Sequence, residues 1–116
     1  MKLHVAARGG LDLSGGLRDY IDRRVHFSLG RFAGRIRRLS VRIADVNGPR
    51  GGVDKSCHIR VDAGLRQQVV VREQQSSVHA AVAFAAERAE RALRRQLNLA
   101  ASQPRRAGAQ PDPKGL

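Results

Sequence analysis

The 116-residue sequence has no tryptophan, one tyrosine, three phenylalanines and a single cysteine. Because aromatic residues make up only 3% of the chain, a hydrophobic core has to be built from aliphatic side chains and alanine. One cysteine excludes a disulfide within the chain. No segment is long and apolar enough to span a membrane, and the first residues lack the apolar stretch of a signal peptide. These absences predict one small domain located in the cytoplasm.

Acidic residues are scarce as well. Ten Asp and Glu stand against 22 Lys and Arg, which gives a formal net charge of +12 at pH 7. Nineteen of the 22 basic residues are arginine, the side chain that forms bidentate contacts with phosphate. A balance this basic implies an anionic partner, and nucleic acid is the leading candidate.

The sequence also lacks the convergent groups that an enzyme needs. Its four histidines are scattered singly, and Cys57 and His58, adjacent on a predicted strand, have to point to opposite faces. No Cys/His cluster has the spacing of a zinc site, and neither GxxxxGK[ST] nor GxSxG is present. The sequence therefore predicts no catalytic site, no metal, no cofactor and no small-molecule substrate.

The hydrophobic pattern predicts the element order β-α-β-β-β-α. Strands are expected at residues 2–7, 36–45, 54–62 and 67–73. Helices are expected at residues 17–33 and 76–97, with Gly30 weakening the last turn of the first helix. The helical connection makes the first two strands parallel, whereas the later strands are antiparallel, the first of their links being the turn NGPRGG at residues 47–52. The expected fold is an α+β two-layer sandwich, with two parallel helices on one face of a four-stranded mixed sheet.

The domain is expected to occupy residues 1–98. Residues 99–116 contain three of the four prolines and almost no bulky apolar side chain. Such a segment has too little apolar surface to bury, so the sequence predicts a disordered basic tail.

The charges of the last predicted helix are sorted. Arg88, Arg91 and Arg95 follow one another at i, i+3 and i+7 beside the apolar face. The opposite flank is expected to carry Glu87, Glu90 and Arg94, of which Glu90 and Arg94 can pair. Three guanidinium groups in a row without carboxylates between them suggest a polyanion as partner. An ordinary solvated helix face is the alternative interpretation.

The first predicted helix has a similar flank, formed by Tyr20, Arg24, Phe27 and Arg31. Aromatic rings between arginines could stack on bases of single-stranded nucleic acid. The more usual role of such rings is to pack against a neighbouring helix. Periodicity alone leaves open which role applies, and whether the two arginine flanks form one surface.

Three segments carry a resemblance to a known family: LRDYIDRRV, NGPRGGVDKSCHIRV and VHAAVAFAAERAERALRRQL. Over roughly residues 2–98 the chain resembles the short form of the ribosome hibernation promoting factor and ribosome-associated inhibitor A family, also called sigma-54 modulation proteins. The resemblance implies a fold like that of double-stranded RNA-binding domains with an added N-terminal strand. It also implies a non-enzymatic protein that binds the small ribosomal subunit near the decoding sites, blocks mRNA and tRNA, and silences translation in stationary phase.

The resemblance further implies which residues bind rRNA, namely Arg24, Arg31, Arg88, Arg91 and Arg95. Arg31 stands in for a lysine that the family commonly has at the position of Gly30. Off the ribosome the protein is expected to be a monomer. Two other functions stay open: a free-standing double-stranded RNA-binding protein, and a protein-interaction regulator of the kind that the sigma-54 label implies.

Overall fold

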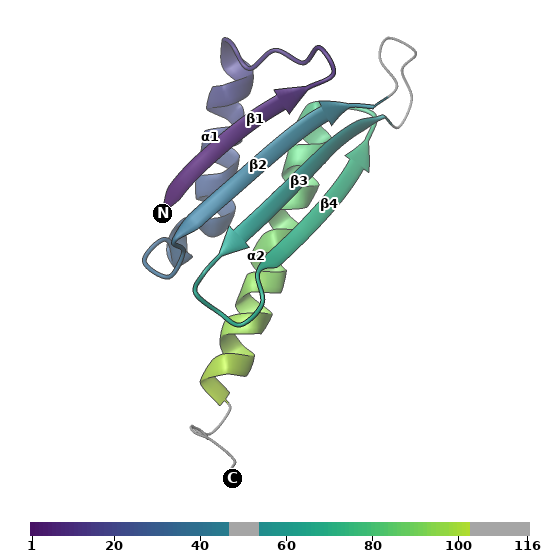
Figure 1. Cartoon of the computed structure of the whole chain (residues 1–116). Helices are drawn as coiled ribbons and strands as arrows, with labels where there is room; N and C mark the ends of the chain where they lie inside the picture. Colours follow the sequence, from purple (N-terminus) through teal and green to yellow (C-terminus); the bar gives the residue numbers. More distant parts are fainter. Residues whose placement is uncertain (47–53, 103–116) are drawn as a thin grey trace.

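The computed structural model describes residues 1–46 and 54–102 of the chain. The elements in order are β1 (Lys2–Arg8), α1 (Gly16–Leu29), the 3₁₀ turn η1 (Gly30–Phe32), β2 (Arg38–Asp45), β3 (Lys55–Asp62), β4 (Val69–Gln75) and α2 (Val78–Ser102). This order confirms the predicted β-α-β-β-β-α arrangement (Figure 1). The predicted turn at residues 47–52, and the predicted tail from residue 103 onward, lie outside the described residues.

The four strands form one mixed sheet in the order β1-β2-β3-β4. As predicted, β1 runs parallel to β2, and the two later pairs are antiparallel. The register places Val5, Val41, Ile59 and Val71 opposite one another across all four strands. Because side chains alternate between the two faces of a strand, this row of β-branched residues lies on the face that the helices cover.

Both helices cover the same face of the sheet and run in the same direction (Figure 1). Helix α2 packs on β3 and β4 and lies alongside α1. Its buried side is rich in alanine, and small side chains at such a contact shorten the distance between packed elements. The fully buried residues of this side are Ala81, Val82, Ala85, Ala86, Ala89 and Leu93. The predicted α+β two-layer sandwich, with an aliphatic core, is confirmed.

Both helices end at different residues from those expected. Helix α1 stops at Leu29, and the chain continues as a 3₁₀ turn from Gly30, in line with the low helix propensity of glycine. Helix α2 begins at Val78, where the Ser77 hydroxyl oxygen accepts a hydrogen bond from the Ala80 N–H at 3.0 Å. Its C-terminal end lies at Ser102, so the expectation of a disordered segment is wrong for residues 99–102. That stretch is leucine, two alanines and serine, and its leucine and alanine residues are good helix formers.

The neighbours Cys57 and His58 lie on opposite faces of β3, as their positions on the strand predicted. Cys57 is completely buried under the helices, whereas His58 faces the uncovered side of the sheet. Burial, with a smaller contribution from the charge of Glu73, raises the pKa of the Cys57 thiol to about 12. The thiol therefore stays protonated at neutral pH and acts as a small core side chain.

Candidate nucleic-acid interface

Tyr20, on the flank of α1 that carries the interleaved aromatics and arginines, packs against α2. Its ring centroid lies 4.5 Å from that of His79, and its hydroxyl donates a hydrogen bond to the His79 carbonyl oxygen at 3.1 Å. For this residue the packing role applies rather than base stacking. The contact shows that the N-terminal part of this flank of α1 lies against α2.

Phe27, seven residues further along the same flank, is in a different situation. Its side chain is 81% exposed, although phenylalanine is among the residues most often buried. The Arg24 guanidinium lies 5.1 Å from the ring centroid and donates a weak hydrogen bond to the Ser28 hydroxyl at 3.5 Å. The ring and the cation together form an exposed apolar and charged surface on α1.

Arg31 reaches from η1 to α2. Its guanidinium forms an ion pair with the mostly buried carboxylate of Glu90 and lies 5.1 Å from the Phe32 ring centroid. Glu90 also pairs with Arg94 at 3.4 Å, which confirms the predicted contact within α2. One carboxylate thus holds two guanidinium groups on the side of α2 that faces α1.

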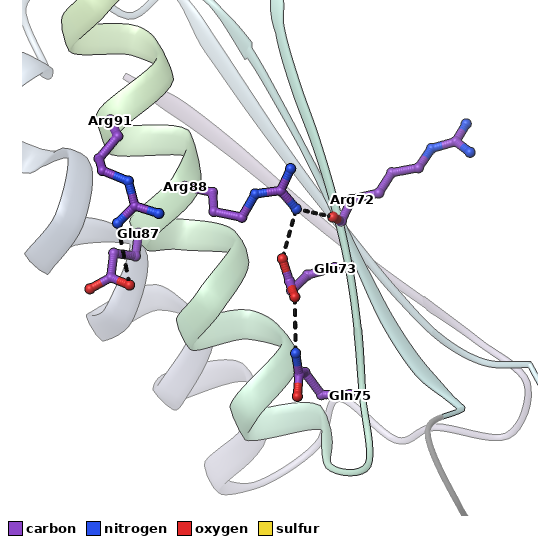
Figure 2. A network of polar contacts seen from close by, with 6 residues as sticks. All are labelled: Arg72, Glu73, Gln75, Glu87, Arg88 and Arg91. Atoms are coloured by element: carbon purple, nitrogen blue, oxygen red, sulfur yellow. Dashed lines mark hydrogen bonds and ion pairs between the residues drawn. The ribbon is translucent and has the colours of Figure 1, made fainter.

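Arg88 leans the other way, toward β4 (Figure 2). Its Nη1 donates to the Glu73 carboxylate at 2.7 Å and to the Arg72 carbonyl oxygen at 2.5 Å. Gln75 donates a further hydrogen bond to Glu73 at 2.9 Å. The hydrogen bond from Arg88, and after it that from Gln75, hold the pKa of the Glu73 carboxyl below its usual value.

Arg91 pairs with Glu87, one turn earlier on α2, at 3.5 Å (Figure 2). The prediction of three guanidinium groups without carboxylate partners is therefore wrong for Arg88 and Arg91. The partner of Arg88 comes from a strand that a helical projection does not contain, and the partner of Arg91 lies at the i−4 position. Arg95 has no hydrogen bond or ion pair with any other residue in the described part of the chain.

The C-terminal half of α2 carries a shallow hollow in its surface. The hollow is lined by Arg91, Arg94, Arg95, Asn98 and Leu99. Arg94, placed by the helical projection on the opposite flank, therefore shares this surface with Arg91 and Arg95. The five predicted rRNA-binding arginines do not form a single row. Arg31 approaches α2 from the α1 side, whereas Arg88 leans toward β4.

Within residues 1–46 and 54–102, no group of three or more His, Cys, Asp or Glu side chains is placed to hold a metal ion. Neither described helix contains an apolar stretch sufficient to cross a membrane.

The structure is that of a small basic α+β domain with exposed arginines on both helices. The chain belongs to the sigma-54 modulation protein / S30EA ribosomal protein family, whose family model matches residues 3–98. The resemblance identified from the sequence is therefore confirmed. The family is not enzymatic, and membership implies association with the ribosome and a part in the regulation of translation.

Two solved structures share the fold. The N-terminal domain of Protein Y from Thermus thermophilus is similar with a TM-score of 0.66 and 20% sequence identity, over 82% of this chain and 98% of that one. A ribosomal subunit interface protein from Coxiella burnetii is similar with a TM-score of 0.64 and 13% identity, over 88% of this chain and 100% of the other. Identities this low support the shared fold alone. No curated protein matches the chain in sequence.

Proposed function

We propose that this protein is a cytoplasmic ribosome-hibernation factor that binds the small ribosomal subunit near its decoding sites and blocks mRNA and tRNA. The rRNA phosphates are contacted by Arg24, Arg31, Arg88, Arg91 and Arg95. Family membership supports the ribosome as partner, and a position at the subunit interface agrees with the fold shared with the ribosomal subunit interface protein from Coxiella burnetii. Off the ribosome the protein is a monomer, and its action in stationary phase belongs to the same proposal.

The observation that carries the proposal is that three of these arginines stay exposed to solvent although each forms an ion pair with a carboxylate of the domain. The side chains of Arg31, Arg88 and Arg91 are 61%, 49% and 54% exposed. Surface ion pairs of this kind contribute only about 0–1 kcal/mol each, so a phosphate can compete with the carboxylate. A guanidinium also has five N–H donors, and one carboxylate leaves several of them available.

The mechanism needs no bond to be made or broken. Neutralising phosphates with arginines releases condensed counterions, which drives the association. Proteins recognise structured RNA largely by its shape and backbone, and a folded two-layer domain presents a rigid surface for this purpose. Once seated in an RNA-lined channel, the domain excludes mRNA and tRNA by its volume.

Salt dependence tests the proposal. Five phosphate contacts at roughly 0.7–0.9 each predict a log–log slope of at least about −3.5 to −4.5 for co-sedimentation with purified small ribosomal subunits. A slope near about −1 would contradict phosphate-driven binding and would favour a protein-interaction regulator. Equal affinity for a naked RNA duplex would instead favour a free-standing double-stranded RNA-binding protein.

A matched pair of variants tests the position of the charges. Arg95→Glu reverses the charge of the arginine that has no partner among the described residues. Arg35→Glu makes the same charge change at an exposed position between η1 and β2. Arg94 is not suitable as the control, because it lines the same hollow as Arg95. We expect Arg95→Glu to weaken subunit binding far more than Arg35→Glu at fixed salt. Equal losses would mean that only the total charge matters.

A further inference from the structure

The face of the sheet that the helices leave uncovered is strongly basic. Figure 1 looks onto this open face, with α1 and α2 behind it. Strand alternation and register assign one set of side chains to it. Its basic members are Lys2, Arg8, Arg38, Arg42, Arg60 and Arg72, together with His4 and His58. Asp62 is the one acidic side chain that the four described strands direct to this face.

The arginines at the centre of the open face lie close together across the strands. Arg42 of β2 and Arg72 of β4 are the direct cross-strand neighbours of His58 in β3, so the three form a row across the sheet. Arg60 lies two residues along β3 on the same face, and a shallow pocket is lined by Arg42, His58 and Arg60 together with Ser40, Ile59 and Val70. Arg42 and Arg72 flank His58, and Arg60 lies diagonal to both, so three like charges are close together on one face and repel one another unless an anion compensates them.

No carboxylate compensates these charges within the described residues. Arg42, Arg60 and Arg72 have no ion pair or side-chain hydrogen bond there, in contrast to Arg31, Arg88 and Arg91 on the helical side. Figure 2 shows the Arg72 side chain extending away from α2, while its carbonyl oxygen holds Arg88 on the other side of the strand. Each layer of the domain therefore presents its own arginines outward.

The composition of the face indicates which partner it fits. The four described strands direct no Phe, Tyr or Trp to it on which bases could stack, and small residues such as Ala6, Ser40 and Ala44 lie between the arginines. Guanidinium groups separated by small side chains allow close approach of a charged backbone, and bidentate contacts with phosphate are what arginine forms best. The chemistry is that of an RNA phosphate backbone rather than of exposed bases.

We propose that the open face of the sheet, centred on Arg42, Arg60 and Arg72, is a second RNA-binding surface that contacts the phosphate backbone. The domain is then held by RNA on both of its layers. The inference rests on the proposed function in taking this RNA to be rRNA of the small subunit. Five contacts from the helices and three from the sheet predict a salt slope of about −5.6 to −7.2, steeper than the helices alone provide.

His58 connects this surface to pH. Its pKa is lowered from the ordinary value by burial and then by the charges of Arg72, Arg42 and Arg60. No other charged side chain faces it from the neighbouring strands, because Ala6 completes the row on β1 and the helices lie on the opposite face. Phosphates that neutralise the three arginines raise the pKa of His58 again. Binding of RNA then takes up a proton, so the affinity for RNA increases as the pH falls and His58 becomes protonated.

The first experiment compares two triple variants by their salt slopes on purified small ribosomal subunits. One is Arg42→Gln/Arg60→Gln/Arg72→Gln, and the control is Arg18→Gln/Arg23→Gln/Arg35→Gln, which removes the same charge from exposed positions outside the open face. The sheet variant is expected to have a salt slope shallower than that of the wild type by about 2–3. The slope of the control is expected to change by less than the amount that one phosphate contact contributes, about 0.7–0.9. Equal slopes for the two variants would overturn the inference.

Folding of the sheet variant is verified independently. Removing three charges that repel one another is expected to leave its melting temperature equal to or above that of the wild type. Should the variant unfold instead, the single substitution His58→Gln gives a second readout, since it is expected to abolish the gain in subunit affinity that accompanies protonation of His58 as the pH falls. Persistence of the full pH dependence in this variant would overturn the inference.

A photo-crosslinking amino acid identifies the partner class. Val70 is 53% exposed on the open face, and Phe84 is 48% exposed on α2. Crosslinks to rRNA from both positions are expected. RNA crosslinks from position 84 alone, or crosslinks from position 70 to ribosomal protein, would refute the second surface and leave the proposed function standing. Absence of crosslinks from both positions, with no co-sedimentation of the wild type, would refute both.

Discussion

The proposed binding mode gives Arg88 a part in folding as well as in RNA binding, but gives Arg95 a part in binding only, and this difference can be measured. Arg88→Gln removes a guanidinium that donates to Glu73 at 2.7 Å and to the Arg72 carbonyl oxygen at 2.5 Å. We expect a loss of about 0.2–1 kcal/mol in the free energy of unfolding, the usual range for an exposed ion pair. Arg95→Gln removes no internal partner among the described residues, so its effect is expected to stay within about 0.5 kcal/mol of zero.

The two substitutions are expected to act alike on the ribosome. Each removes one phosphate contact, so each reduces the salt slope of subunit binding by about 0.7–0.9. Urea unfolding measures the first quantity and co-sedimentation at several salt concentrations measures the second. Equal destabilisation by Arg88→Gln and Arg95→Gln would refute the assignment of Arg88 to both roles.

The loss of unfolding free energy caused by Arg88→Gln is expected to depend on pH, and this dependence provides an internal control. In the folded protein the Glu73 pKa lies below the ordinary value of 4.5, chiefly because Arg88 donates to the carboxylate. The pair therefore stabilises the fold above about pH 4.5, and this contribution is lost as the pH falls through the lower folded pKa. A double-mutant cycle with Glu73→Gln measures the coupling at neutral pH and well below 4.5. Coupling that survives at the acidic pH would mean that Arg88 acts through something other than the Glu73 carboxylate.

Three further predictions address separate features. Phe27→Ala is expected to leave the melting temperature unchanged, because the ring is exposed, and to weaken subunit binding by about 1–3 kcal/mol if the ring stacks on a base. Gly9→Ala is expected to destabilise the protein more than Gly10→Ala. Both glycines have positive φ, but only at Gly9 would an added methyl group meet the backbone of β2. Equal melting temperatures of the two variants would contradict this. Deleting residues 103–116 is expected to leave the melting temperature unchanged, because the buried core ends at Leu97; loss of the cooperative melt would show that the tail packs on the domain.

The sequence predicted the fold well because its elements have clear periodicity and few alternatives. Period-two alternation around Val41 and Ile59 identified paired strands, and the helix between the first two strands required a parallel pair. Helix ends were less predictable, because Gly30 permits either a frayed turn or a 3₁₀ turn, and because leucine and alanine at residues 99–101 favour helix even without burial.

The candidate site was predictable in its residue types but not in its pairing. A helical projection places Arg88 correctly on the flank of α2, yet it contains no information about β4, from which Glu73 reaches the guanidinium. It also separates Arg94 from Arg95 by angle, although long side chains from both line one hollow. Contacts between elements that are distant in sequence depend on register and packing, and neither can be read from the periodicity of one element.

The positions of the few carboxylates explain why the arginines of the two layers differ. On the helical side Glu73, Glu87 and Glu90 each hold at least one guanidinium, so several arginines there are partly neutralised. On the open face of the sheet Asp62 is the one described acid, and its carboxylate accepts a hydrogen bond from the Gly64 N–H. The excess positive charge is therefore concentrated on the layer that has fewer internal contacts. Since attraction to phosphate depends on local rather than total charge, the proposed second surface predicts that each arginine of the sheet contributes at least as strongly to RNA binding as each arginine of the helices.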